Sequence, residues 1–170
     1  MEAVKLEGGV EMAETVRAIV NAGIPVMWHI GLTPQSINRL GGFKTQGRDA
    51  ATAKQLLDDA VALEQAGAFA VLLEAIPDRV AQLIHERAGV PIIGIGAGPH
   101  CHGQLIIVHD LLGLFEKFTP RFAKRYTNLS EVIGQAFADY KQEVEAGAFP
   151  GPEHCWTIKD DELAKLKAML

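Results

Sequence analysis

Short apolar segments alternate along the chain with segments in which apolar residues recur at helical spacing. The apolar runs that have the length of buried strands are Val4–Leu6, Ile24–Ile30, Phe69–Leu73, Pro91–Ile95 and Leu105–Val108. Most of them are rich in valine and isoleucine, as parallel strands covered on both faces tend to be. The pattern therefore predicts parallel strands at these positions.

Helical spacing predicts helices between and after the strands. They are Glu11–Asn21, Lys54–Gln65, a helix that begins at Pro77, Asn128–Ala146 and Lys159–Leu170. Strands that alternate with helices predict a parallel sheet with helices packed against it. An open, doubly wound sheet and a segment of a barrel both satisfy this order. In either architecture the carboxyl ends of the strands carry the chemistry, so candidate residues are sought there.

Composition narrows the classes of function. The 170 residues are 48% hydrophobic and 22% charged, with a formal net charge of -5, which is typical of a globular domain. The mild acidity and the lack of a basic cluster argue against a nucleic-acid partner. No apolar run approaches the ~18 residues of a membrane span, and the acidic start resembles no signal peptide. Cys101 and Cys155 form no disulfide framework, so we expect a reduced compartment, the cytoplasm.

Charged residues stand at the ends of two predicted strands. Lys5 and Glu7 are two residues apart, so their side chains share one face of the first strand. If this face lines an active site, Lys5 could hold an oxyanion and Glu7 a cation. Otherwise the two residues are an ordinary solvent-exposed pair. Glu74 ends an apolar run, where a partly buried carboxylate is suited to work as a general base. The alternative is an acid that caps the helix beginning at Pro77.

Glycines and histidines supply weaker signals. The segment Gly94–Gly98 follows a strand, but Pro99 stands where a dinucleotide-binding fingerprint has its third glycine. We therefore expect only a tight turn at which the backbone approaches a ligand. The run of residues 100–102, His-Cys-His, has no zinc-ligand spacing and is expected to be an exposed loop. His29 is either a core histidine whose ring nitrogens have hydrogen-bond partners, or a residue that lines a ligand pocket.

Several motifs occur together in one order. They are VKLEGG at 4–9, HIGLTPQS at 29–36, GGFKTQGR at 41–48, LE at 73–74, IGIGAG at 93–98 and FPGPEH at 149–154. Together they resemble the ketopantoate hydroxymethyltransferase family over about residues 2–157. The resemblance implies an α/β fold, a partial (β/α)8 TIM barrel of the phosphoenolpyruvate/isocitrate-lyase-like group. The strands here would be its strands four to eight, with residues 1–157 forming the barrel part and 158–170 a helical tail.

The resemblance also implies a reaction and roles for residues. A hydroxymethyl group would pass from 5,10-methylenetetrahydrofolate to 3-methyl-2-oxobutanoate, giving 2-dehydropantoate in pantothenate biosynthesis through a Mg²⁺-stabilised enolate. Lys5 would bind the 2-oxo acid, Glu7 would belong to the Mg²⁺ site, and Glu74 would remove the C3 proton. The residues expected to line the same pocket are His29, Gly96 and Gly98. We expect a homo-oligomer as the assembled form.

Three departures from the family pattern bear on this expectation. The first three strands, with the aspartates that hold Mg²⁺ and the substrate carboxylate, have no counterpart here. Trp28 stands where glycine is usual, and is expected to narrow the pocket or repack the helix layer. His102 replaces an aspartate. The alternatives are an active enzyme represented here by a partial chain, with a missing N-terminal half; a catalytically inactive remnant serving as a structural or assembly subunit; and another enzyme of the same barrel group. The specific motifs argue against the last.

Overall fold

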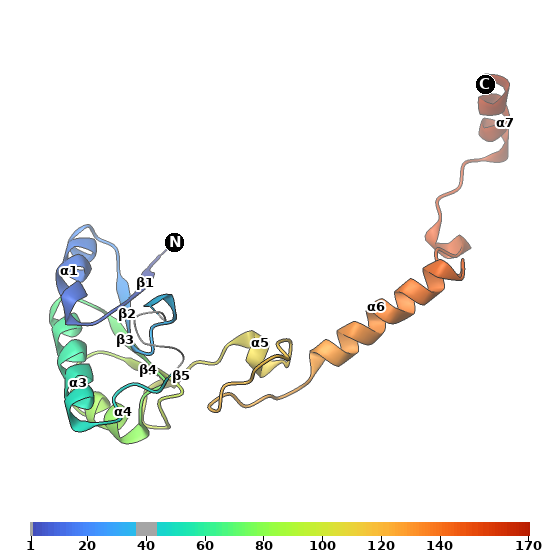
Figure 1. Cartoon of the computed structure of the whole chain (residues 1–170). Coiled ribbons are helices and arrows are strands. Elements are labelled where there is room, and N and C mark those ends of the chain that lie inside the picture. Colours follow the sequence, from blue (N-terminus) through green and yellow to red (C-terminus); the bar gives the residue numbers. More distant parts are fainter. Residues whose placement is uncertain (1, 37–43) are drawn as a thin grey trace. The chain divides into compact units, whose positions relative to one another are not determined.

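The structure, a computed structural model, describes residues 2–36 and 44–170 (Figure 1). Part of the motif expected at 41–48 therefore lies outside the described residues. The chain divides into two compact units, Met1–Tyr126 and Thr127–Leu170, and each is described by itself. The division expected at residue 157 stays a prediction.

The first unit is built on a parallel sheet whose strands follow one another in chain order. The strands are β1 (Val4–Glu7), β2 (Val26–Gly31), β3 (Ala70–Glu74), β4 (Ile92–Ile95) and β5 (Gly103–Gln104). All four neighbouring pairs are parallel. The parallel sheet is confirmed, and β1 to β4 lie within two residues of their predicted positions.

The last strand differs from its prediction. The sequence placed it at Leu105–Val108, but β5 ends at Gln104, and Val108–Leu111 forms a short helix, α5. Leu105 N–H still donates to the carbonyl of Gly94 at 2.8 Å, and this is where the ladder stops. The reason is β4 itself: Gly96 has a φ of +67° and turns the chain away, so the following residues have no neighbouring strand to pair with.

Helices pack against one face of this sheet. A 3-10 turn, η1 (Val10–Met12), leads into α1 (Ala13–Asn21), and α3 (Ala50–Gln65) and α4 (Asp78–His85) follow (Figure 1). Helix α3 begins earlier than predicted, because the Asp49 side chain accepts a hydrogen bond from Thr52 N–H at 2.9 Å and starts the helix there. These bonds from Thr52 hold the pKa of Asp49 below its ordinary value.

The core lies between these helices and one face of the sheet. Side chains alternate along β2, so Val26, Trp28 and Ile30 face the helices and His29 faces the other way. The buried cluster joins those three residues to Val16 of α1, Leu56 and Leu63 of α3, Ala81 and Ile84 of α4, and Val71 and Leu73 of β3. Chain-order strands with helices on the same face follow a singly wound path, whereas a doubly wound sheet reverses its order and is covered on both faces.

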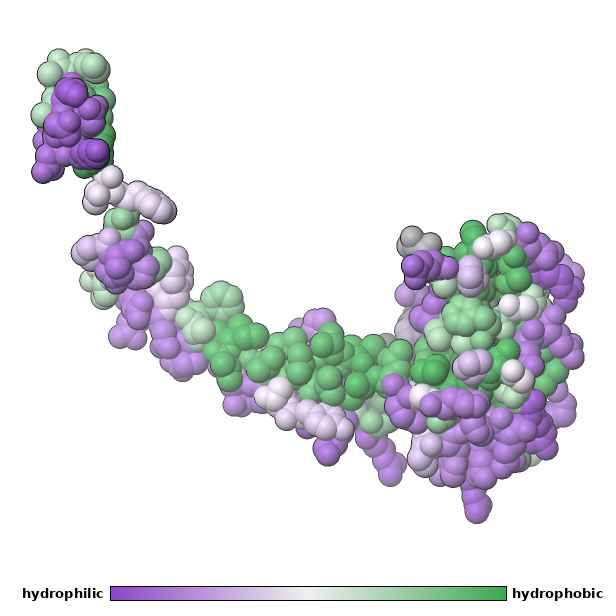
Figure 2. Space-filling view, turned by 180° about the vertical axis from the view of Figure 1, so that it is seen from behind, coloured by the Kyte–Doolittle hydropathy of each residue, from purple (hydrophilic) through white to green (hydrophobic). Residues whose placement is uncertain are grey.

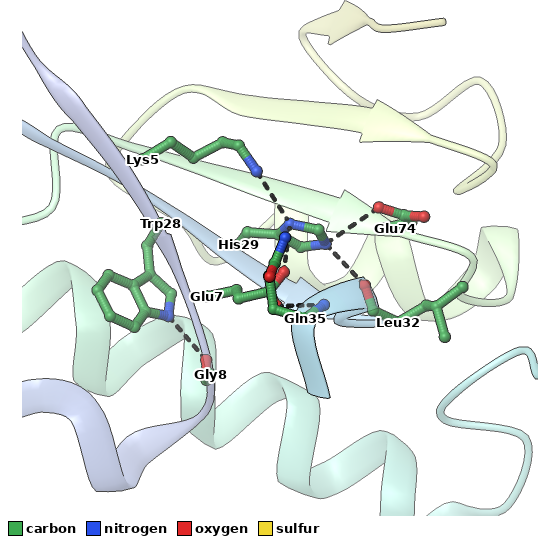
Figure 3. Close-up of polar contacts among 8 residues, drawn as sticks. All are labelled: Lys5, Glu7, Gly8, Trp28, His29, Leu32, Gln35 and Glu74. Atoms are coloured by element: carbon green, nitrogen blue, oxygen red, sulfur yellow. Dashed lines mark hydrogen bonds and ion pairs between the residues drawn. The ribbon is translucent and has the colours of Figure 1, made fainter. Parts of the chain in front are cut away.

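Trp28 belongs wholly to this core. Its side chain is fully buried, and its indole N–H donates to the carbonyl of Gly8 at 2.7 Å (Figure 3). Of the two places considered for it, the ring occupies the helix layer. The hypothesis that Trp28 narrows the pocket is therefore wrong, because the ring lies on the opposite face of the sheet from the polar residues described below.

The second unit consists of α6 (Leu129–Glu145), the 3-10 turn η3 (Pro152–His154) and α7 (Asp160–Ala168). Both helices lie close to their predicted positions. Figure 2 shows hydrophobic surface exposed along this unit. On α6 the exposed apolar and aromatic side chains at helical spacing form a stripe: Ile133, Phe137, Tyr140 and Val144. The spacing of these residues places them on one face of the helix. Within the described residues, no helix is both long enough and apolar enough to cross a membrane.

Candidate functional site

Four polar residues meet at the carboxyl ends of β1, β2 and β3 (Figure 3). The register pairs Glu7 with His29 and Gly31 with Glu74, so parallel strands bring these ends together. Lys5 lies two residues before Glu7 and shares its face. The structure thus brings together Lys5, Glu7, His29 and Glu74, on the face of the sheet opposite the hydrophobic core.

His29 is the centre of this group. Its Nδ1 atom lies 3.3 Å from Nζ of Lys5 and 3.6 Å from Oε2 of Glu7. Its Nε2 atom lies 2.7 Å from the carbonyl oxygen of Leu32 and 3.3 Å from Oε2 of Glu74. The ring is 2% exposed, so these contacts are shielded from water. His29 is therefore both a satisfied buried histidine and the residue that links the charged groups of three segments.

The partners of the imidazole indicate its protonation. The carbonyl of Leu32 can only accept, so Nε2 carries a proton and donates to it. The ammonium of Lys5 can only donate, so Nδ1 accepts from it. The neutral Nε2–H tautomer satisfies both contacts. In this tautomer Nε2–H donates to Leu32 with Oε2 of Glu74 close by, and the lone pair of Nδ1 faces Lys5.

The turn after β2 depends on Gly31. This residue has a φ of +94°, and a side chain here would collide with the carbonyl of Glu74. The close approach lets Leu32 N–H donate to that carbonyl at 2.8 Å. The chain then enters the 3-10 turn η2 (Pro34–Ser36), whose Gln35 N–H donates to Oε1 of Glu7 at 2.7 Å. The motif at 29–36 thereby holds two carboxyl-bearing strands in place.

The backbone of Ala75, the residue that follows Glu74, adopts an unusual conformation. Ala75 has a φ of +48°, a conformation that residues other than glycine rarely adopt and that costs of order 1 kcal/mol or more. Two hydrogen bonds maintain it: Ala75 N–H donates to Ile95 at 2.9 Å, and Gln46 N–H donates to Ala75 at 3.0 Å. The Glu74 side chain is 15% exposed. The sequence carries no signal for the strain at Ala75.

Gly96 and Gly98 follow β4, whose last residue, Ile95, pairs with Glu74. They line a cavity of about 880 Å³ together with Ala75, Asp78, Gln104, Arg121, Phe122 and others. A second cavity, of about 400 Å³, is lined by residues on the helix side of the sheet, among them Ile30, Leu56 and Asp59. Lys5, Glu7, His29 and Glu74 line neither cavity. Ala75, the residue after Glu74, lines the same cavity as Gly96 and Gly98. The expectation that His29 shares a pocket with these glycines stays a prediction.

The described residues do not make a magnesium site by themselves. Mg²⁺ takes about six oxygen ligands in near-octahedral order. Glu7 offers one carboxylate, and Oε1 of that group already accepts from Gln35. Nowhere in residues 2–36 and 44–170 do three or more His, Cys, Asp or Glu side chains gather closely enough to hold a metal ion. This includes the His-Cys-His loop, where His102 instead accepts a bond from Ile92 N–H at 3.1 Å and burial raises the pKa of the Cys101 thiol.

Comparison with known proteins places this arrangement in a family. The family described as ketopantoate hydroxymethyltransferase matches residues 1–152. A 3-methyl-2-oxobutanoate hydroxymethyltransferase of Syntrophomonas wolfei is 54% identical over 96% of this chain and 59% of its own length. One of Enterococcus faecalis is 54% identical over 97% of this chain and 60% of its own length. The chain thus spans about three fifths of the length of these relatives. It belongs to the ketopantoate hydroxymethyltransferase family.

Proposed function

We propose that this chain carries the proton-abstracting half of an enzyme that transfers a hydroxymethyl group to 3-methyl-2-oxobutanoate. The relatives are named for this reaction. The observation that supports it most directly is the group around His29: a carboxylate, Glu74, and an ammonium, Lys5, lie on opposite sides of one imidazole. Proton removal beside a carbonyl needs a base and a positive partner for the oxygen, and this group contains both.

In the proposed reaction the Glu74 carboxylate accepts the C3 proton of the 2-oxo acid. The electron pair of the broken C–H bond spreads onto the carbonyl oxygen, and the Lys5 ammonium stabilises the resulting negative charge. Water releases the methylene carbon of 5,10-methylenetetrahydrofolate as formaldehyde, which breaks both of its C–N bonds and leaves tetrahydrofolate. The C3 atom then bonds to this carbon, and the new alkoxide oxygen takes a proton to become the hydroxyl group. His29 acts as a positioning residue, since its two nitrogens hold the base and the ammonium in register.

Mg²⁺ remains an expected cofactor of the assembled enzyme, with Glu7 as one ligand. It would polarise the carbonyl oxygen of the substrate. Because Glu74 is the proposed base and Glu7 is one carboxylate, the other oxygen ligands would come from another polypeptide segment. The structure supports a role for Glu7 only in that its carboxylate faces the same group as Lys5 and Glu74.

The same reasoning leads us to propose a partial (β/α)8 barrel. A sheet in chain order with its helices on one face is the arrangement a barrel requires. Within the described unit, β1 pairs only with β2, and β5 only with β4. Such edges present free backbone donors and acceptors, which favours association with further strands. We propose that strands from a partner complete both the barrel and the metal ligands, and that the assembly is cytoplasmic.

A structural or assembly role is the second candidate. One observation favours it for the chain alone: in the described residues, no three His, Cys, Asp or Glu side chains gather to hold a metal ion. A subunit of this kind would contribute packing surface without turnover. The two candidates differ in whether Glu74 removes a proton once the missing elements are supplied.

Hydrogen–deuterium exchange at C3 of 3-methyl-2-oxobutanoate, followed by proton NMR in deuterated water, tests this difference. The 170-residue chain is assayed alone and with a polypeptide that supplies the first three strands of the Enterococcus faecalis relative, with and without Mg²⁺. We expect no exchange by the chain alone and Mg²⁺-dependent exchange by the mixture. Exchange by the chain alone would refute the need for a partner, and a folded mixture without exchange would favour the structural role.

A further inference from the structure

The cavity of about 400 Å³ lies on the helix side of the sheet and takes no part in the proposed proton transfer. Its lining includes Ile30 of β2 and Leu56 and Asp59 of α3, whereas the neighbouring His29 faces the opposite side of the sheet. Its volume falls within the ~300–1,000 Å³ that is usual for sites of small organic molecules. A molecule bound here would be separated from the candidate base by the sheet, so it would not be a substrate of the proposed reaction.

This cavity has a buried apolar part and an exposed polar part. Ile30 and Leu56 line it and are buried among the core residues. Glu11, Thr52 and Gln55 also line it, and all of them are exposed to solvent. A ligand with an aliphatic portion and a polar group would therefore find a matching surface for each.

The charged side chains of this cavity are acidic. Glu11 and Asp59 line it, and its lining contains no Lys, Arg or His among the residues that the structure describes. The two carboxylates meet over Gly9, where the absence of a side chain leaves the space open. A β-carbon built on Gly9 would lie 2.7 Å from Oε2 of Glu11 and 3.0 Å from Oδ2 of Asp59. Such a lining repels carboxylate and phosphate ligands and attracts a cation.

Asp59 supplies an independent sign of a ligand. Its side chain is 6% exposed, and Oδ1 accepts hydrogen bonds from Val10 N–H at 2.8 Å and from the Gln55 amide at 2.9 Å. These bonds account for a structural role, because they tie η1 to α3. Oδ2 accepts no hydrogen bond from any residue in the described part of the chain. A carboxylate oxygen on a buried side chain is costly without a donor, and a cation in the cavity would provide one.

We infer that this cavity binds a small organic ammonium, a primary amine with a short aliphatic chain, through the carboxylates of Asp59 and Glu11. An ammonium carries several N–H donors and no acceptor, so it satisfies Oδ2 of Asp59 and the Glu11 carboxylate together. The amide nitrogen of Gln55 donates to Asp59, which leaves its amide oxygen as a further acceptor. The aliphatic chain packs against Ile30 and Leu56.

An inorganic cation matches this cavity less well. Divalent metal ions take about six or more oxygen ligands at short range. Within residues 2–36 and 44–170, no three His, Cys, Asp or Glu side chains gather to hold such an ion. The cavity is also many times larger than one ion, and part of its lining is apolar. An organic cation matches both the acidic and the apolar part of the lining.

Titration of the 170-residue chain with pentylammonium chloride, followed by NMR of the backbone amides, tests the inference. We expect saturable shifts of the Gly9 and Val10 amide signals, which lie beside the two carboxylates. Hexanoate has a similar length and the opposite charge, and it should leave these signals in place. Potassium chloride and magnesium chloride should do the same. The inference is overturned if pentylammonium causes no shifts, or if hexanoate or either inorganic salt causes the same ones.

Three variants separate ligand binding from the structural role of Asp59. Asp59→Asn keeps an oxygen for Val10 N–H and puts an amino donor in place of Oδ2, so the Kd of pentylammonium should rise by about 10-fold or more. Glu11→Gln should raise it by about 2- to 5-fold, because that side chain is exposed. Asp58→Asn makes the same change at an exposed position of α3 and should leave the Kd unchanged.

An unchanged Kd in the folded Asp59→Asn variant would overturn the inference. If that variant does not fold, an unchanged Kd in Glu11→Gln would do so. The measurement involves neither the 2-oxo acid nor proton exchange, so its result is independent of the proposed function.

Discussion

The imidazole of His29 lies 3.3 Å from the carboxylate of Glu74, across two neighbouring strands of the sheet. The contact joins residues that are far apart in the chain, and the Leu32 carbonyl fixes the ring from the same side at 2.7 Å. A base that must meet one particular C–H bond benefits from such a fixed neighbour, because misplacement of a reacting group is costly. The contacts on Nε2 of His29 therefore determine both the tautomer of the ring and the position of the Glu74 carboxylate beside it.

Replacement of Glu74 by glutamine should abolish proton exchange in the assembled enzyme. The substitution keeps the shape and removes the basicity, and loss of a general base typically costs about 10²–10⁴-fold in rate. Exchange at C3 of 3-methyl-2-oxobutanoate, measured by NMR, is the readout. Glu86→Gln at the end of α4 is the control and should exchange at the parent rate. Parent-rate exchange by Glu74→Gln would show that another residue takes the proton.

The His29→Phe variant tests the positioning role. A phenyl ring preserves the volume but leaves the Leu32 carbonyl and the Lys5 ammonium without their partner. The free energy of unfolding should fall by about 1–3 kcal/mol in urea titrations. In the assembled enzyme, exchange should also slow, although Glu74 is intact. His109→Phe, at an exposed histidine of α5, should change neither quantity. Unchanged stability and exchange in His29→Phe would contradict the assignment.

Trp28 should contribute stability rather than hinder binding. Trp28→Ala removes a fully buried side chain and should lower the free energy of unfolding by about 3–5 kcal/mol. Trp28→Phe retains most of the packing and loses the bond to Gly8, with an expected cost of about 1–2 kcal/mol. Trp156 is fully exposed, so Trp156→Ala should have an effect below about 0.5 kcal/mol. A more stable Trp28→Gly variant would restore the hypothesis of crowding.

Asp49 should make the stability of the first unit depend on acid pH. Its pKa in the folded chain is lowered, chiefly because Thr52 N–H and the Thr52 hydroxyl donate to the carboxylate. A lowered pKa stabilises the fold above the ordinary value of 3.8, and this contribution is lost as the pH falls through the folded-state pKa. Asp49→Ala should therefore be less stable than the wild type at pH 7, and the difference should shrink below about pH 3.8.

Urea titrations at pH 7 and at several acid values measure this difference. Asp49→Asn is the matched control, because an amide oxygen still caps the helix but carries no charge. It should be close to the wild type at pH 7 and should not show the acid dependence of the carboxylate. A difference between wild type and Asp49→Ala that stays constant down to acid pH would contradict the assignment.

The exposed stripe on α6 should drive self-association. Phe137 and Tyr140 are largely exposed in the second unit, and apolar helix faces of this kind are normally covered. Light scattering coupled to size-exclusion chromatography should show an oligomer for the 170-residue chain. The double substitution Phe137→Ser with Tyr140→Ser should lower the measured mass, whereas Lys141→Ser on the same helix should not. A monomeric wild-type chain would refute the expectation of an oligomer.

Much of the first unit follows from local pattern. Apolar runs and helical periodicity predicted β1 to β4 and the main helices, because each buries a face that its own residues define. The prediction was wrong at Leu105–Val108, where an apolar run exists but its neighbouring strand has already turned away at Gly96. A strand forms only where a neighbouring strand can pair with it, and the local sequence pattern does not show whether such a neighbour exists.

Some residues of the candidate site could likewise be predicted from the sequence, and others could not. Sequence reasoning could single out Lys5 and Glu7 by their two-residue spacing on a strand, and Glu74 by its place at the end of a buried apolar run. It left His29 between two interpretations, and the cavity that Gly96 and Gly98 line is shared with Ala75, next to Glu74. The register between neighbouring strands decides which charged side chains contact His29. This register depends on how two strands pair, and the sequence of one strand does not give it.

The sequence by itself determined which segments become strands and helices, which face of each is apolar, and which family the chain resembles, because these depend on the order of side chains along the backbone. Only the tertiary structure decided that Trp28 packs into the helix layer, that His29 joins Lys5 to Glu74, and that Ala75 accepts a strained backbone beside the base. Each of these is a contact between residues distant in the chain. Its energy arises only when the parallel sheet has assembled and excluded water from the groups involved.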